Sequence, residues 1–374
     1  MANIDNQIND FLKAVYVRSH SEHTRIGYHQ GIKKFIEFLS SRGTTLEETE
    51  NKIRVNEIDV YKLLNDFVVF LDGKNLKPRT INHWIAAVKG YLRYCGIKIY
   101  NEDFKQVVRM PRKAKTKEIP LTKEIIVKLL RNVSPKLQTI ILVLVASGMR
   151  IGELVQLKLS DIDFTCNPTK ISLRAETTKT RTSRETFLTS EATGALKDYL
   201  KRYHGWDANS SNLHLQNKLI FGRTSVGTRL VKKEEELTIK KCSNAQLLLQ
   251  KALVRAVKKL PDLYLKNENG GNFIHFHAFR KFFRTTVGNV CGRDFAEAIM
   301  GHTFYLDTYY QLTEEKKQEM YLKAEPNLTI SDFKTVEKNI SDLSQRCAHL
   351  EDMVQGLKQY MIKNSVEIPT YLTN

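Results

Sequence analysis

Six side chains with the chemistry to bind and cleave a phosphodiester follow one another along the chain. They are Arg150, a His-x-x-Arg pair made of His277 and Arg280, and then His302 and the neighbouring tyrosines Tyr309 and Tyr310. Two guanidinium forks can meet the negative charge of a phosphate in transfer. A phenol has a pKa of ~10, so it needs a base or a cationic neighbourhood before it attacks at neutral pH. The order therefore predicts attack of a tyrosine on a phosphodiester.

The departing sugar oxygen needs a proton in the same step, and a lysine on a flexible turn could deliver it as a general acid. Lys179 lies in such a turn, between the strand-like runs 170–173 and 185–188. We therefore expect Lys179 to be the general acid.

As a set, these motifs resemble those of tyrosine recombinases of the phage-integrase family, over residues 21–324. The resemblance implies that Arg150 and Arg280 clamp the phosphate and that His277 and His302 handle protons or bind phosphate. It also implies that Glu153 orients its neighbours. The hairpin lacks the glycine-lysine-glycine turn common in the family, and aligning 186–188 with the closing strand selects Lys179.

The position of the nucleophile departs from the commonest family spacing. Nine residues beyond the histidine of the Gly-His motif, where many bacterial members have the tyrosine, this chain has Gln311. Residues 306–314 look more like archaeal-type integrases, in which a Leu-Asp-x-x-Tyr run implies Tyr310. Tyr309 and Tyr305 remain the alternatives.

A metal site is the competing interpretation of the histidines. His275, His277 and His302 could be three imidazole ligands of a catalytic zinc ion. Carboxylates and cysteines do not fall at ligand spacing around them, and Arg280 would place a cation beside the metal. The sequence therefore predicts no metal and no other cofactor.

The composition predicts a polyanionic partner. The 374 residues include 59 Lys and Arg against 41 Asp and Glu, a net charge of +18. The charge indicates a nucleic-acid partner, and the resemblance implies that this is double-stranded DNA bound by a homo-oligomer, a dimer or tetramer. No apolar run is long enough for a membrane span, and the five cysteines lack paired spacing. Reduced thiols and a cytoplasmic, nucleoid-associated location are expected.

The periodicity of apolar residues predicts a mainly α fold with a small antiparallel β-sheet. Helices are expected behind residues 21–24, over 60–71 and after 77–80, forming a helical domain at 1–104. A basic linker that stays extended is predicted at 105–120, and an α+β catalytic domain at 121–328. In that domain 140–146 should be a buried helix that delivers Arg150, and helix should return at 243–260. Residues 204–241 are assigned only a strand at 219–221.

The resemblance implies that the helical domain is a core-binding domain that grips DNA. Its basic residues, with those of the linker, are the candidate phosphate contacts. They are Lys77, Arg79, Lys89, Arg93, Arg109, Arg112, Lys113 and Lys115.

Residues 329–374 contain a heptad pattern, with apolar side chains at alternating spacings of three and four. They are Phe333, Val336, Ile340, Leu343, Cys347, Leu350, Val354, Leu357 and Met361. The pattern is typical of a coiled coil between subunits, or of a helix that folds back on its own domain.

The sequence thus predicts a site-specific DNA recombinase, an integrase, that cleaves and rejoins DNA through a 3′-phosphotyrosyl link. Two alternatives remain open. One is a type IB topoisomerase-like enzyme, and the other is an architectural DNA-binding protein that kept the fold without the reaction.

Overall fold

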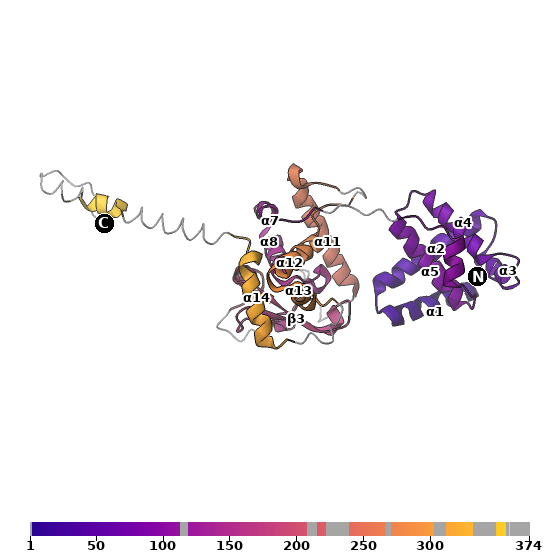
Figure 1. Cartoon of the computed structure of the whole chain (residues 1–374), viewed down its shortest axis with the longest axis horizontal. Helices are drawn as coiled ribbons and strands as arrows, with labels where there is room; N and C mark the ends of the chain where they lie inside the picture. The colour runs from indigo at the N-terminus through magenta and orange to yellow at the C-terminus, as the bar shows by residue number, and fades with distance from the viewer. Residues whose placement is uncertain are drawn as a thin grey trace. The chain divides into compact units, whose positions relative to one another are not determined.

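The chain forms two compact units, Met1–Thr116 and Lys117–Asn374, in the computed structural model (Figure 1). The structure describes residues 2–112, 119–207, 215–221, 239–266, 271–302, 312–331, 349–356 and 359. None of the helices in these ranges is both long and apolar enough to span a membrane. The mainly helical fold with one small sheet confirms the predicted fold class.

The N-terminal unit is entirely helical in its described residues. Its helices are α1 (Ala2–Ser19), α2 (Glu22–Ser41), α3 (Leu46–Arg54), α4 (Val60–Asp72), α5 (Pro78–Tyr94) and α6 (Asn101–Val107). Side-chain caps fix three of the starts, at Ser21, Thr45 and Asp59. The long helices α2 and α5 lie against each other. Their contact is close, because a Cβ on Gly31 would lie 2.9 Å from the Cβ of Ala87.

The extended linker predicted from residue 105 begins too early. Lys105 lies in α6, and the next residue after that helix, Val108, is 3% exposed in the core of the unit. The backbone N–H of Arg109 donates to Asn65 Oδ1 at 2.9 Å. The basic residues do not keep this stretch from packing, because Val108 supplies an apolar anchor between them. Lys113 and Lys115 lie outside the described residues.

The second unit combines helices with a three-stranded antiparallel sheet of order β1-β2-β3. The strands are β1 (Ile162–Asp163), β2 (Thr169–Leu173) and β3 (Arg184–Leu188), and Ile171 pairs with Ile162 on one side and Thr186 on the other. The helices are α7 (Lys123–Leu130), α8 (Pro135–Ser147), α9 (Ile151–Leu154), α10 (Ser190–His204), α11 (Ile239–Lys258), α12 (Phe276–Cys291), α13 (Arg293–Met300) and α14 (Glu314–Leu328). Short 3-10 turns cover 159–161, 175–177 and 261–263. The strand predicted at 219–221 is reduced to one isolated bridge between Lys158 and Leu219.

Helix α8 is the centre of this unit, because α10, α12, α14 and β3 all pack against it. Nine of its residues are buried, among them Ile140, Ile141 and Leu144, so the prediction of a buried helix leading to Arg150 is confirmed. Polar contacts tie neighbours to its C-terminal end. Thr186 Oγ1 on β3 donates to Ser147 O at 2.7 Å, and the Tyr321 hydroxyl on α14 donates to Ala146 O at 2.8 Å.

The second unit extends past the boundary predicted after residue 328. Ile330 is 4% exposed in the core. Glu191 on α10 accepts hydrogen bonds from the backbone N–H groups of Ile330, at 2.7 Å, and Ser331, at 2.9 Å. In return, Glu325 on α14 accepts from Ser190 N at 2.6 Å, at the start of α10. The chain is therefore still anchored at Ser331.

Most of the predicted heptad segment lies outside the described residues. Within it, 349–356 are helical, and Leu350 and Val354 are 58% and 37% exposed. Pairing through this segment stays a prediction.

Candidate active site

Arg150 is positioned by a reversal of the chain at the end of α8. Gly148 has a φ of +61°, in the left-handed region, and a Cβ at this residue would overlap the ring of Phe283. Only glycine meets both requirements without strain. Arg150 then becomes the residue preceding α9. The glycine two residues before the arginine is thus explained by the turn.

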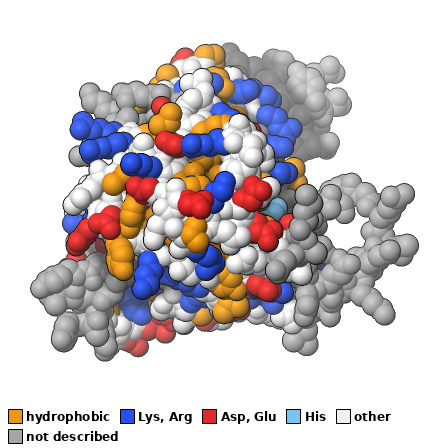
Figure 2. Space-filling model, turned by 90° about the vertical axis from the view of Figure 1, so that its right-hand side faces the viewer, with side chains coloured by type: hydrophobic (Ala, Val, Ile, Leu, Met, Phe, Trp, Pro, Cys, Tyr) orange, Lys and Arg blue, Asp and Glu red, His pale blue; other side chains and the backbone are white. Residues whose placement is uncertain are grey.

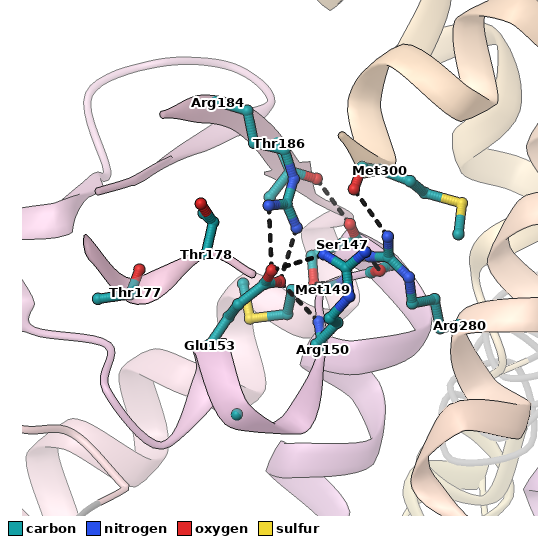
Figure 3. Close-up of polar contacts among 12 residues, drawn as sticks. Ser147, Met149, Arg150, Glu153, Thr177, Thr178, Arg184, Thr186, Arg280 and Met300 are labelled. Atoms are coloured by element: carbon teal, nitrogen blue, oxygen red, sulfur yellow. Dashed lines mark hydrogen bonds and ion pairs between the residues drawn. The ribbon is translucent and has the colours of Figure 1, made fainter. Parts of the chain in front are cut away.

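Glu153 holds Arg150 from the far end of the short helix α9 (Figure 3). Its Oε2 accepts from the backbone N–H of Arg150 at 2.7 Å, and its Oε1 accepts from the Arg150 guanidinium at 2.9 Å. The carboxylate side chain is 2% exposed, whereas that of Arg150 is 24% exposed. The expected orienting role of Glu153 has this geometric basis, and the Arg150 side chain stays partly exposed.

Arg280 reaches the same place from α12 and is almost completely buried, at 1% exposure. Its guanidinium donates to Gly148 O, to Met300 O at 2.7 Å and to His302 Nε2 at 2.9 Å. Its Nε–H has no hydrogen-bond partner among the described residues. Burial, and then the charge of Arg150, lower the pKa of Arg280 to about 9, so the group remains charged at neutral pH.

His302 follows the left-handed Gly301 that ends α13, and both of its ring nitrogens are engaged. Nδ1 lies 2.5 Å from Glu297 Oε2, and Nε2 accepts from Arg280. Glu297 is 5% exposed and is held by Arg284 Nε at 2.6 Å. This pattern fixes the proton on Nδ1. Burial lowers the pKa of His302, outweighing the opposing effect of Glu297, so the ring is neutral at pH 7.

His277 lies in the first turn of α12 and is exposed. Its ring centroid is 6.4 Å from that of His275. Partial desolvation lowers the pKa of His277, and the positive charges of Lys281 and Arg280 act in the same direction. This imidazole is therefore a neutral proton acceptor at pH 7 that faces solvent.

Lys179 lies among the described residues, whereas the candidate tyrosines do not. Lys179 is exposed in the turn between β2 and β3, directly after Thr178, whose hydroxyl donates to Ala175 O and Thr182 O, each at 3.0 Å. Its role as general acid stays a prediction. Tyr310 and the alternatives Tyr309 and Tyr305 lie outside the described residues.

The metal interpretation finds little support in this geometry. His302 directs one nitrogen to a carboxylate and the other to an arginine. Over the described ranges, no group of three or more His, Cys, Asp or Glu side chains is arranged to hold an ion.

The predicted phosphate contacts of the N-terminal unit divide into two groups. Lys77, Arg79, Arg109 and Arg112 are exposed. Lys89 and Arg93 already make contacts inside the unit. Lys89 lies over the ring of Phe104, and Arg93 donates to Ile99 O. Figure 2 looks onto this unit from the end where α3 lies, and there acidic side chains are interspersed among the basic ones.

Arg184 and Glu297 were not predicted from the sequence, although they contact Glu153 and His302, respectively. Arg184, the first residue of β3, donates to both carboxylate oxygens of Glu153. Glu297 lies in α13, five residues before His302, which follows the turn at the end of that helix, so its spacing carried a weak signal. Arg184 lies 31 residues from Glu153 and carried none.

Known proteins resemble this chain in fold and in sequence. A structure of a lambda integrase tetramer bound to a Holliday junction matches with a TM-score of 0.53 and 15% identity, over 83% of this chain and 80% of that one. A lambda integrase dimer bound to a COC' core site matches with a TM-score of 0.53 and 16% identity, over 83% and 98%. At such identities the likeness concerns the fold.

Two curated relatives are tyrosine recombinases. XerA of Pyrococcus furiosus is 30% identical over 148 residues, 36% of this chain and 49% of the relative. XerC of Bacillus licheniformis is 28% identical over 174 residues, 44% and 54%. The chain thus spans about half the length of these relatives.

The matches to family profiles cover more of the chain. Residues 8–95 match the phage integrase N-terminal SAM-like domain. Residues 119–315, more than half of the chain, match the phage integrase family and include the arginine, His-x-x-Arg and Gly-His motifs. The protein belongs to the phage integrase family.

Proposed function

We propose that this protein is a site-specific DNA recombinase that cleaves and rejoins DNA through a covalent tyrosyl intermediate. The observation that carries the proposal is the convergence of Arg150, which precedes α9, and Arg280 of α12 beside His302. Two buried carboxylates, Glu153 and Glu297, hold the arginine and the imidazole in place. Preorganised cations of this kind stabilise a phosphate whose negative charge grows during transfer.

In the proposed reaction the Tyr310 phenol oxygen attacks a DNA phosphorus atom and the bond to the 5′ oxygen breaks. The phenol proton passes to the neutral His277, because both ring nitrogens of His302 are already engaged, and Lys179 gives a proton to the departing 5′ oxygen. A 5′-hydroxyl from a partner duplex then reverses the step and frees the tyrosine. The phosphodiester is exchanged for a phosphotyrosyl ester of similar energy, so no energy source such as a nucleotide is needed.

The proposed substrate is double-stranded DNA bound by a dimer or tetramer of the chain. Its net charge of +18 and the matching DNA-bound lambda integrase assemblies support this. We place the protein in the cytoplasm, with the nucleoid, where such DNA is found. The helical unit Met1–Thr116 is proposed as the core-binding domain, and the second unit, which is anchored as far as Ser331, as the catalytic domain.

The test is trapping of the covalent adduct on DNA that carries a 5′-bridging phosphorothiolate at the cleavage site. Tyr310→Phe should form no adduct while retaining DNA binding, because only the attacking oxygen is lost. Tyr309→Phe is the matched control and should still form it. Peptide mapping of the wild-type adduct identifies the residue directly. An adduct on Tyr309 would identify that residue as the nucleophile in place of Tyr310. A reaction that EDTA abolishes and zinc restores would contradict the metal-free mechanism.

A further inference from the structure

Arg184 is linked to Arg150 of the proposed phosphate clamp through Glu153, which lies between the two arginines (Figure 3). Its guanidinium donates to Glu153 Oε1 at 3.1 Å and to Glu153 Oε2 at 2.6 Å. Its Nε–H donates to Ile299 O at 3.1 Å, near the end of α13. The side chain of Arg184 is 8% exposed, so its positive charge is buried inside the unit.

Glu153 is consequently shared between two arginines. Its oxygens accept from the Arg150 backbone and side chain on one side and from the Arg184 fork on the other. A lone buried carboxylate beside Arg150 would cancel the charge that the phosphate needs. With Arg184 present, two positive charges flank one negative charge, and the group of three retains a net +1. Burial acts to raise the pKa of Glu153, but Arg184 and then Arg150 hold it below its usual range.

Arg184 connects three segments of the site. It begins β3, the strand that follows the Lys179 turn, and it is bonded to Ile299 next to the Gly-His motif. A Cβ on Gly301 would lie 2.6 Å from Arg184 Cδ, and Gly301 has a φ of +64°. The glycine before His302 is therefore required both by the turn and by the stem of Arg184.

We propose that Arg184 is a positioning residue that keeps the fork of Arg150 available to the DNA phosphate by occupying the opposite side of Glu153. The inference rests on the proposed function. When Arg184 is removed, Glu153 turns to its remaining partner, and Arg150 is drawn into a closed ion pair. The role is electrostatic, so removing the charge of Glu153 should make Arg184 dispensable.

The experiment compares adduct formation by wild type, Arg184→Gln, Glu153→Gln and the double variant, on suicide DNA at saturating concentration. Arg184→Gln should lower the rate by ~10²-fold, the usual effect of losing one preorganised donor. The double variant should react at about the rate of Glu153→Gln alone, because no carboxylate remains to capture Arg150. The deficit of Arg184→Gln should also shrink as the pH falls and Glu153 becomes protonated.

Tyr321→Phe is the control for general destabilisation. It removes a buried hydrogen bond of the same unit, from the Tyr321 hydroxyl to Ala146 O, without changing any charge at neutral pH. It should lower the melting temperature without altering how the rate depends on pH. Multiplicative losses in the double variant, with a deficit independent of pH, would overturn the electrostatic role and leave Arg184 as an ordinary structural ion pair.

A second readout separates this inference from the proposed function. The affinity for duplex DNA is measured for Arg150→Gln in the wild-type and Arg184→Gln backgrounds. If Arg184 controls Arg150, Arg150→Gln should lower the affinity for DNA in the wild-type background. In the Arg184→Gln background the same change should cause little further loss. This result without any adduct from wild type refutes the recombinase proposal alone. Equal losses in both backgrounds refute the role of Arg184 alone.

Discussion

Glu153 and Glu297 each fix one functional side chain of the cluster, and each is neutralised from behind by an arginine. Glu153 has Arg184 as its second partner, and Glu297 has Arg284. Each carboxylate is therefore shared between a functional side chain and a compensating arginine. Arranged in this way, a dense group of cations can persist in a folded interior without direct repulsion at every contact.

The lowered histidine pKa values predict that stability decreases on mild acidification. Burial lowers the pKa of His277 and His302 below the ordinary value of 6.5. The unfolded chain therefore binds more protons than the folded chain just below pH 6.5, and the free energy of unfolding decreases as the pH falls through this interval. Glu153 and Glu297, whose pKa values lie below 4.5, add a second decrease below that pH.

The measurement is denaturant unfolding between pH 8 and pH 3. His277→Gln, at an exposed position, should flatten only the first decrease. A profile that is level from pH 7 to pH 5 for wild type would contradict the lowered pKa values of these imidazoles.

The motif residues could be predicted because their spacing along the chain is informative, but their partners could not. Arg150, Arg280 and His302 do come together as expected. The contact of Arg184 with Glu153 depends on where β3 lies against α9, which no local pattern specifies.

At the scale of elements, the reversal of the chain after α8 connects this buried helix directly to Arg150 in the site. Periodicity predicted α2, α4, α5 and α8 well, because each has a continuous apolar face. It missed α3, in which Leu46 and Ile53 are the only buried apolar residues. It also missed α6, which has no buried residue and is followed directly by the basic stretch.

Gly148→Ala should be strongly destabilising. A non-glycine residue in the left-handed region costs about 1–2 kcal/mol. Overlap of the new methyl group with the Phe283 ring adds roughly 1–3 kcal/mol. Gly194→Ala, in the middle of α10 with open space around it, is the control and should stabilise by ~0.5–1 kcal/mol. Chemical denaturation of both variants provides the comparison, and equal effects would show that the turn does not require glycine.

At the scale of the whole molecule, the composition and motif order predicted the class of protein, but the end of the second unit was placed too early. The reason is that Glu191 and Glu325 pair α10 with the end of α14 across more than a hundred residues. Contacts between such distant parts of the chain leave no signal in local periodicity. The predicted oligomer likewise depends on surfaces that a single chain does not reveal.

Two truncations test where the folded unit ends. A chain that ends at Ser331 should melt close to wild type, because Ile330 and its bonds to Glu191 are retained. A chain that ends at Leu328 loses the buried Ile330, worth about 1.5–3 kcal/mol, and leaves Glu191 without these donors. Thermal unfolding distinguishes them.

Sedimentation of the Ser331 truncation on DNA then tests the tail, and loss of pairing with intact cleavage is expected if the heptads join subunits. Identical melting of the two truncations would contradict the anchoring role of Glu191, and unchanged assembly would favour a tail that folds back.

The buried Nε–H of Arg280, which no described residue satisfies, carries a penalty that the other contacts of the side chain offset. An apolar side chain of similar length would remove that orphaned donor and a charge from the interior, but it would leave Gly148 O, Met300 O and His302 Nε2 without their donor. The turn after α8 and the Gly-His turn would both lose a bond to the same side chain. In a decaying genomic copy that has lost Arg280, the fold is therefore expected to weaken together with the reaction.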